Sequence, residues 1–305
     1  MSWSTSDIPD LTGRRALVTG ATSGLGYETA LELLKHGAEV TIAARNPEKS
    51  EQAAAKLRAA TGTEPAVLAL DLADLASVQD AAKSFSATQE SLDLLVNNAG
   101  VMATPYRQTT DGFELQLGTN HLGHFALTAR LLPLLQQAKN PRVVTVSSFM
   151  HKTVNTVRQA DLRAENGYAK WDAYGRSKLA NLLFMRELDR RARAAGSSLV
   201  SVGSHPGYAR THLQSSGPQL GGANLEARLL AIGTNLVAQS AAAGAWPSLY
   251  AATTPGVPSG SYYGPSFFEF RGKPKLVHPS KAAQDPELAQ HLWAWSVEAT
   301  GVNAF

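Results

Sequence analysis

Short apolar runs alternate with longer segments of helical periodicity through the first two thirds of the sequence. Strands are predicted at six places: 16–19, 39–43, 66–70, 92–96, 142–146 and 199–203. Helices are predicted between them, at 25–35, 46–60, 75–85, 112–138 and 173–194. Strands joined by helices of this length form right-handed βαβ units, which build a parallel sheet. Because no linker interrupts the pattern from residue 14 to about 205, we expect one α/β domain.

A glycine pattern, Thr19-Gly20-x-x-x-Gly24-x-Gly26, connects the first predicted strand to the first helix. Gly20 permits a tight turn, Gly24 lets the backbone approach a diphosphate, and Gly26 lets helix and sheet pack closely. The helix N-terminus offers free N–H groups to an anion. A plain structural turn is the alternative, but the strand–glycine–helix context favours a diphosphate cradle. We assign to this cradle Gly20, Thr22, Ser23, Gly24, Leu25 and Gly26.

The end of the second predicted strand indicates which dinucleotide is bound. NAD sites commonly place a carboxylate there for the ribose 2′-OH, whereas an arginine accommodates a 2′-phosphate. The sequence has Arg45 at this point and no carboxylate, and Arg14, Arg15 or Lys49 could add charge. A solvated loop residue is the alternative interpretation of Arg45. We therefore favour NADP(H) as the cofactor, with NAD(H) possible.

Polar or small residues also follow the other predicted strands, where ligands of parallel sheets bind. After the third, fourth, fifth and sixth strands, respectively, stand Asp71-Leu72, Asn97-Asn98-Ala99-Gly100, Ser147-Ser148, and Pro206-Gly207 with Thr211. Asp71 is suited to accept a hydrogen bond from the adenine amino group, and equally to N-cap the next helix. Asn120 lies inside a predicted helix, where a polar amide is not a natural helix former.

Tyr174 and Lys178 are four positions apart in a predicted helix, so both side chains lie on one helical face. A nearby ammonium lowers the pKa of a phenol and so suits it to acid–base chemistry. An ordinary amphipathic helix face is the alternative interpretation of this pair.

In order and spacing, these motifs resemble the signatures of the short-chain dehydrogenase/reductase family over residues 12 to about 300. The resemblance implies one Rossmann-type domain: a doubly wound parallel sheet of about seven strands, helices on both faces and a small helical substrate lid. It places the dinucleotide-binding and catalytic core at 12–205, the lid region at 206–260, and a C-terminal strand and helix at 261–305.

The resemblance also implies the residue roles. Tyr174 is the expected acid/base, and Ser148 is expected to hydrogen-bond the substrate oxygen, with Ser147 as second choice. Lys178 is expected to bind the nicotinamide ribose and lower the Tyr174 pKa, and Asn120 to hold a water on a proton path. Further cofactor contacts are expected from Arg45, Asp71, Leu72, Asn98, Ala99, Gly100, Pro206, Gly207 and Thr211. Hydride transfer between the cofactor and a substrate carbon is the implied reaction.

Ser148 and Tyr174 stand 26 positions apart, so the sequence between them forms an insertion beside the substrate. Together with the GAWPSLYAAT and GSYYGP segments, it resembles the retinol dehydrogenase-like branch, which is typically NADP(H)-linked. Absence of cysteine argues against the related light-driven protochlorophyllide reductases. Aromatic and apolar residues of the insertion suggest a lipophilic alcohol, aldehyde or ketone, although plain packing would also explain them: Phe149, Met150, Tyr168 and Trp171.

The segment after Thr211 corresponds to the expected lid. Its glycines suit hinges: Gly217, Gly221 and Gly222. Its leucines form an apolar face that suits either a substrate or core packing: Leu225, Leu229, Leu230 and Leu236.

Composition and charge exclude several other classes. The net charge is only +3, and the arginines near residue 190 alternate with acids, which is typical of a solvated helix face and not of a nucleic-acid site. No apolar run reaches the length of a membrane span, and the N-terminus lacks the apolar stretch of a signal peptide or membrane anchor. We therefore expect a cytoplasmic protein that acts on a small molecule and could form a homodimer.

No metal is expected, because the histidines are not paired with carboxylates at ligand spacing, and His121 and His124 suit packing or hydrogen bonding. The leading hypothesis is an NADP(H)-dependent oxidoreductase. A dinucleotide-sensing binding protein without turnover is a second, and epimerisation or dehydration of a nucleotide sugar is a third.

Overall fold

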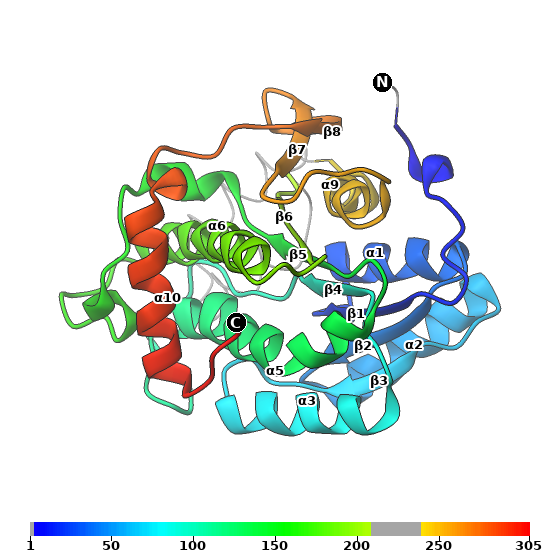
Figure 1. Ribbon diagram of the computed structural model, residues 1–305, viewed down its shortest axis with the longest axis horizontal. Coiled ribbons are helices and arrows are strands. Elements are labelled where there is room, and N and C mark those ends of the chain that lie inside the picture. The colour runs from blue at the N-terminus through cyan, green and yellow to red at the C-terminus, as the bar shows by residue number, and fades with distance from the viewer. Residues whose placement is uncertain (1–2, 209–238) are drawn as a thin grey trace.

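The computed structural model describes residues 3–208 and 239–305, and one eight-stranded sheet forms its centre (Figure 1). The strands are β1 (Arg15–Thr19), β2 (Glu39–Ala44), β3 (Ala66–Ala69), β4 (Leu94–Asn97), β5 (Arg142–Val146), β6 (Val200–Ser204), β7 (Tyr262–Phe267) and β8 (Arg271–Leu276). Their order, β3-β2-β1-β4-β5-β6-β7-β8, is that of a doubly wound sheet, and the direction of winding reverses between β1 and β4.

The sequence predicted about seven parallel strands, and the eighth is an antiparallel edge strand. β7 and β8 form a hairpin whose turn holds Phe268 and Glu269 in the left-handed region, at φ of 47° and 62°. The residues of β8 are half-buried or exposed, so this strand has no apolar run by which the sequence could predict it. The predicted C-terminal strand and helix are therefore a strand pair and a helix.

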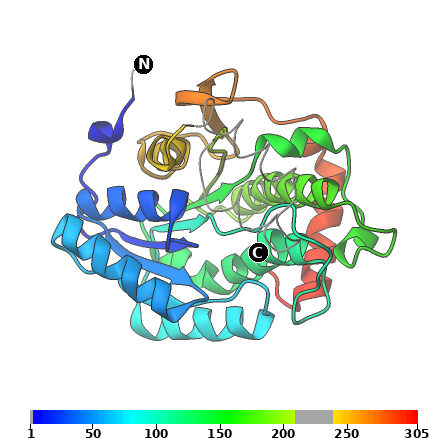
Figure 2. The same cartoon turned by 180° about the vertical axis from the view of Figure 1, so that it is seen from behind.

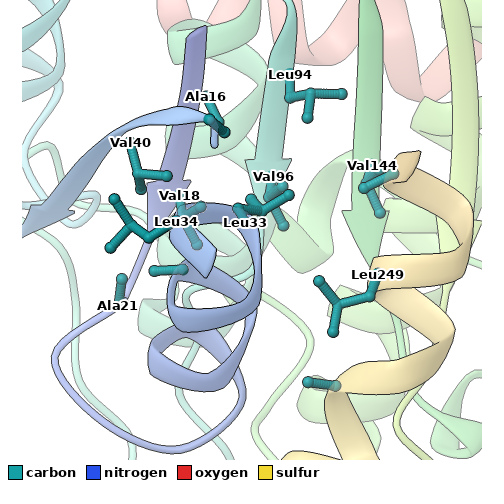
Figure 3. Packing of buried hydrophobic residues seen from close by; sticks show 14 of the residues in the cluster. Ala16, Val18, Ala21, Leu33, Leu34, Val40, Leu94, Val96, Val144 and Leu249 are labelled. Carbon is teal, nitrogen blue, oxygen red and sulfur yellow. The ribbon is translucent and has the colours of Figure 1, made fainter. Parts of the chain in front are cut away.

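Helices cover both faces of the sheet (Figure 2). They are α1 (Gly24–Lys35), α2 (Pro47–Thr61), α3 (Leu75–Thr88), α4 (Leu115–Leu117), α5 (Gly123–Gln137), α6 (Lys170–Ala194), α9 (Ala241–Thr253) and α10 (Pro286–Thr300). Residues of α1, α2 and α9 pack on one face, and residues of α3, α5, α6 and α10 on the other. Figure 3 shows Ala16 and Val18 of β1 in the first of these cores, whereas Leu17 lies in the second. Alternation along a strand therefore builds a three-layer α/β/α domain.

Part of the expected lid region belongs to the core. α9 packs beside α1 in both views, and its Ala245 and Leu249 are fully buried (Figures 1 and 2). The residues proposed as hinges and apolar lid face fall in 209–238, outside the described residues.

The predicted helix at 112–138 is interrupted by a π-helical segment, Gly118–Leu122, between α4 and α5. Glycines at both ends of this segment make close contacts: a Cβ at Gly118 would lie 2.4 Å from Thr109 Cγ2, and a Cβ at Gly123 would lie 2.4 Å from the Leu72 carbonyl oxygen. The π-helical segment is buried throughout and carries Asn120. Wider helical turns of this kind often occur at functional sites.

Candidate active site

The cradle expected from the glycine pattern lies at the end of β1. Gly20 and Gly24 have φ of 68° and 58°, which side chains rarely adopt. A Cβ at Gly20 would lie 2.9 Å from Ala99 Cα, and a Cβ at Gly26 would lie 2.5 Å from Asn98 Nδ2. Ser23 N-caps α1, but its side chain makes no capping hydrogen bond to the first turn. The turn is therefore shaped by close backbone approach, and the helix N-terminus is open to an anion.

Thr19 fastens this turn to the loop after β4. Its Oγ1 accepts the backbone N–H groups of Asn98 and Ala99, both at 3.0 Å, and Asn98 Nδ2 donates to the Thr19 carbonyl oxygen at 2.8 Å. Asn98, Ala99 and Gly100 therefore lie beside the cradle, at the point where the winding of the sheet reverses. Thr19 belongs to the glycine motif, but the sequence indicates no role for its side chain. The groups that bond its hydroxyl, the N–H groups of Asn98 and Ala99, follow a strand far away in the sequence.

Arg45 is exposed just beyond the end of β2, the strand next to β1. Within the described part of the chain, its guanidinium has no hydrogen-bond or ion-pair partner. The suggestion that Arg14 or Arg15 adds charge there is wrong. Both stand at the amino end of β1, whereas Arg45 follows the carboxyl end of the neighbouring strand β2. They face Asp93 and Glu39, at 3.6 and 3.5 Å.

Asp71 does not cap the helix that follows it. Asp74 is the N-cap of α3, and its Oδ1 accepts from the N–H groups of Ala76 and Ser77 at 2.9 and 3.2 Å. Asp71 Oδ1 instead accepts the Ala73 N–H at 2.9 Å and closes the turn after β3. The capping interpretation is therefore wrong, and the adenine interpretation of Asp71 stays a prediction.

Tyr174 and Lys178 lie on the first turns of α6 and are buried, at 6% and 4% exposure. The Ser148 side chain, after β5, lies close enough to the Tyr174 hydroxyl to act on its pKa. Ser147 is buried, and its hydroxyl donates to the Lys178 carbonyl oxygen at 2.8 Å. Of the two serines, Ser148 therefore faces the phenol and Ser147 supports the helix that carries it.

The electrostatics differ from expectation in one respect. Burial raises the pKa of Tyr174 to about 12, although the nearby Ser148 hydroxyl opposes this increase. The Lys178 Nζ lies 5.8 Å from the Tyr174 ring centroid and donates to the Val146 carbonyl oxygen at 3.2 Å. The expectation that Lys178 brings the Tyr174 pKa below 10 is therefore wrong for this structure. Burial also lowers the pKa of Lys178 itself, to about 8.

Asn120 is fixed on both sides of its amide. Its Oδ1 accepts the Val101 N–H at 2.7 Å, and its Nδ2 donates to the Val101 carbonyl oxygen and to Ser177 Oγ, both at 2.9 Å. Gly100 passes close by, since a Cβ there would lie 3.0 Å from Asn120 Oδ1 and 3.5 Å from Lys178 Nζ. The structure thus brings Asn120 and Lys178 together with the expected cofactor loop, which consists of Asn98, Ala99 and Gly100.

The insertion meets the β7–β8 hairpin. Lys152 Nζ contacts both carboxylate oxygens of Glu269, at 2.7 and 2.9 Å, and the Phe149 and Phe270 ring centroids lie 5.7 Å apart. His205 Nε2 faces the same carboxylate at 3.5 Å. Sequence reasoning missed Glu269, because its partners become neighbours only when the hairpin folds back on the insertion.

Other residues proposed from the sequence have varied surroundings. Of the four residues proposed to line a pocket, Tyr168 uses its hydroxyl to donate to the Thr104 carbonyl oxygen at 2.7 Å and to accept from Gln116 Nε2 at 2.8 Å. Gly207 has φ of 64°, and a Cβ there would lie 2.4 Å from the Phe270 carbonyl oxygen. Pro206, the residue before it, is half-buried, whereas Thr211 lies outside the described residues.

Residues 3–208 and 239–305 contain no cluster of three or more potential metal ligands. His121 and His124 are fully buried and hydrogen-bonded. The same ranges contain no helix that is both long and apolar enough to cross a bilayer.

Known proteins are similar to this chain in sequence and in fold. The model of the short chain dehydrogenase family matches residues 14–219. Retinol dehydrogenase 12 of Mus musculus is 38% identical over 95% of this chain and 87% of its own length. Polyprenol dehydrogenase of the same species is 39% identical over 97% and 86%.

Solved structures agree with these relatives. A crystal structure of a Mycobacterium paratuberculosis protein superposes with a TM-score of 0.82, 41% identity and 99% coverage of both chains. A short-chain dehydrogenase from Shigella flexneri, solved with NADP, superposes with a TM-score of 0.63 and 25% identity over 83% of this chain and 97% of that one. The chain therefore belongs to the short-chain dehydrogenase family, as an oxidoreductase of CH–OH groups that is similar to retinol dehydrogenases.

Proposed function

We propose that this enzyme interconverts a lipophilic alcohol and its aldehyde or ketone with NADP(H), and that Tyr174 is the acid/base. One observation carries the proposal: Ser148 and Lys178 both lie near Tyr174, and Gly100, in the loop beside the cradle, lies close to Lys178 and Asn120. These side chains are suited to transfer a proton to or from the oxygen of a substrate that is bound next to the cofactor.

The residues present fit a dinucleotide. The glycine turn leaves no room for side chains against Asn98 and Ala99, and the α1 N-terminus has no capping side chain, which suits a diphosphate. Arg45 offers an exposed guanidinium for a 2′-phosphate. When bound, the nicotinamide would supply the redox chemistry, which is the transfer of a hydride to or from the substrate carbon.

The protonation states of the site residues assign a different role to each of them. With a pKa of about 12, Tyr174 keeps its proton at neutral pH and so can donate it to a carbonyl oxygen during reduction. Ser148 donates a hydrogen bond to the same oxygen, which stabilises the charge that develops there. Lys178 binds the ribose and passes to Tyr174 a proton that comes from solvent through a water held by Asn120, its neighbour across Gly100.

The lipophilic substrate class is supported by the rim of the site. Phe149 is 37% exposed and packs beside Phe270, which is 43% exposed. The relatives include a retinol and a polyprenol dehydrogenase, whose named substrates are both long apolar alcohols. For this chain, long apolar alcohols and the corresponding aldehydes or ketones are therefore the first candidate substrates.

Reduction of a carbonyl panel, followed by NADPH absorbance at 340 nm, tests the proposal. The panel contains retinal, a series of aliphatic aldehydes of increasing length, and glyceraldehyde as a hydrophilic control. We expect kcat/KM to rise with chain length. Tyr174→Phe is expected to abolish turnover and retain NADPH binding, measured by nucleotide fluorescence quenching. Tight NADPH binding by wild type without turnover would instead support the sensing protein.

Two further predictions concern the whole protein. The protein could form a homodimer, and light scattering during gel filtration measures the mass that tests this. A cytoplasmic location also stays a prediction, which cell fractionation checks.

A further inference from the structure

His124 connects two parts of the site that are far apart in the sequence. It lies in the first turn of α5 and is 1% exposed. Its Nδ1 lies 3.0 Å from the Asn120 carbonyl oxygen, and its Nε2 lies 2.9 Å from Thr19 Oγ1. The imidazole thus stands between the strand that begins the cradle and the π-helical segment that carries Asn120.

The acceptors determine where the protons lie. A carbonyl oxygen only accepts, so the His124 Nδ1 must carry the hydrogen that it shares with Asn120. In a neutral imidazole the Nε2 then accepts. The Thr19 hydroxyl has two acceptors within reach, the Val96 carbonyl oxygen at 3.3 Å and the His124 Nε2 at 2.9 Å, and the shorter contact assigns its hydrogen to Nε2. The lone pairs of Thr19 Oγ1 remain free to accept from the Asn98 and Ala99 N–H groups. Hydrogen bonds therefore run in one direction from the cofactor loop through Thr19 and His124 to Asn120.

This network requires a neutral ring. A protonated His124 would direct a third donor at Thr19 Oγ1, which already accepts two N–H groups. Burial lowers the pKa of His124 to about 4, and the charge of Lys178 adds to this effect. The ring therefore stays neutral around pH 7, and its hydrogen-bond partners determine the tautomer.

We propose that His124 is a positioning residue that holds the cofactor loop and Asn120 in one rigid unit. The proposal rests on the proposed function, because it assigns Asn98 and Ala99 to the cofactor and Asn120 to proton transfer. Each half of the imidazole has its own task. Nε2 supports the cofactor loop through Thr19, and Nδ1 holds the backbone from which the Asn120 side chain reaches Val101 and Ser177.

Three substitutions separate the two halves. His124→Asn keeps a donor near the position of Nδ1, His124→Gln keeps an acceptor near the position of Nε2, and His124→Phe keeps only the ring volume. His124→Phe is expected to weaken NADPH binding and lower kcat about tenfold each, because buried polar groups lose their partners. His124→Asn is expected to recover kcat more than NADPH affinity, and His124→Gln the reverse. The KM of the carbonyl substrate is expected to change less than kcat.

His121→Phe is the matched control. His121 is also a fully buried imidazole, but its Nε2 bonds Ser296 on α10, away from the cradle. This variant is expected to lower the thermal unfolding temperature while kcat and NADPH affinity change less than in His124→Phe. If His124→Phe behaves like His121→Phe, the ring only fills space and the proposal is overturned.

The tautomer gives a readout that does not depend on turnover. Nitrogen-15 NMR of the histidine rings is expected to show His124 as the neutral Nδ1–H form, unchanged between pH 6 and 8. An Nε2–H form or a titration in that range would contradict the proposal. Failure of the proposed function looks different, because wild type would then lack turnover while the tautomer and the effects of His124→Gln on NADPH affinity persist.

Discussion

From the end of β5, the Ser148 side chain lies close enough to the Tyr174 hydroxyl on α6 to oppose the rise in the Tyr174 pKa. Ser147 faces the other way and donates to the Lys178 carbonyl oxygen. We therefore expect Ser148→Ala to lower kcat about 10²- to 10³-fold, the usual effect of removing a donor to a developing oxyanion. Ser147→Ala removes a buried hydrogen bond and is expected to cost about 1–3 kcal/mol of unfolding free energy with a smaller loss of kcat. Steady-state kinetics and chemical denaturation distinguish the two, and equal losses of kcat would refute the assignment.

The pH dependence of carbonyl reduction follows from two shifted groups. In the enzyme without cofactor, burial lowers the pKa of Lys178 to about 8. Its positive charge is therefore present at neutral pH and is lost as the pH rises through that value. Tyr174, with a pKa of about 12, keeps its proton over the same range. We expect kcat/KM for NADPH, which reports the free enzyme, to fall above about pH 8. A plateau that extends to pH 10 would show that the charge of Lys178 is not required.

Arg45→Ala is expected to raise the KM for NADPH about 10- to 100-fold and to leave the KM for NADH nearly unchanged, because only NADPH carries the 2′-phosphate. Arg58→Ala is a suitable control, since that arginine pairs with Glu64 near the far end of α2. Initial-rate measurements with both cofactors check the prediction. An equal increase for NADPH and NADH would argue against a 2′-phosphate site.

Glu269 is expected to contribute to stability in a pH-dependent way. His205 and Lys152 lower its pKa to about 2 in the folded protein, against an ordinary value of 4.5. A carboxyl group with a lowered pKa stabilises the fold above its ordinary pKa and loses that effect as the pH falls. The unfolding free energy of wild type should therefore decline from about pH 4.5 toward pH 2, and that of Glu269→Gln should decline less. Denaturant titrations at several pH values measure this.

Glu64→Gln is the control for Glu269→Gln. Its partner Arg58 is 58% exposed, and exposed ion pairs contribute little to stability. The pH profile of Glu64→Gln should follow that of wild type. Parallel profiles for wild type and Glu269→Gln would mean that the Lys152–Glu269 pair does not hold the hairpin in place.

Local features of the sequence determined the elements and the location of the site. Strands β1, β2 and β5 lie within one or two residues of their predicted positions, because their apolar runs and flanking glycines or polar residues are local signals. The carboxyl ends of parallel strands meet at one edge, so the glycine turn, Asn98 and Ser148 could be grouped without knowledge of their contacts. Tyr174 lies in a helix and was assigned to the site through the family resemblance. The π-helical segment was not foreseen, since its residues are buried on all sides and give no periodic signal.

Tertiary structure alone decided what each polar group contacts. The sequence ranks Ser148 above Ser147 only by family resemblance, and the structure shows that Ser147 turns to the Lys178 carbonyl oxygen while Ser148 lies beside Tyr174. The same holds for the Tyr174 pKa, which spacing predicted to fall and which burial raises. Glu269, Thr19 and His124 acquire their roles from partners far away in the chain. Periodicity and spacing report which face a side chain lies on, whereas desolvation and hydrogen-bond direction depend on every element packed around it.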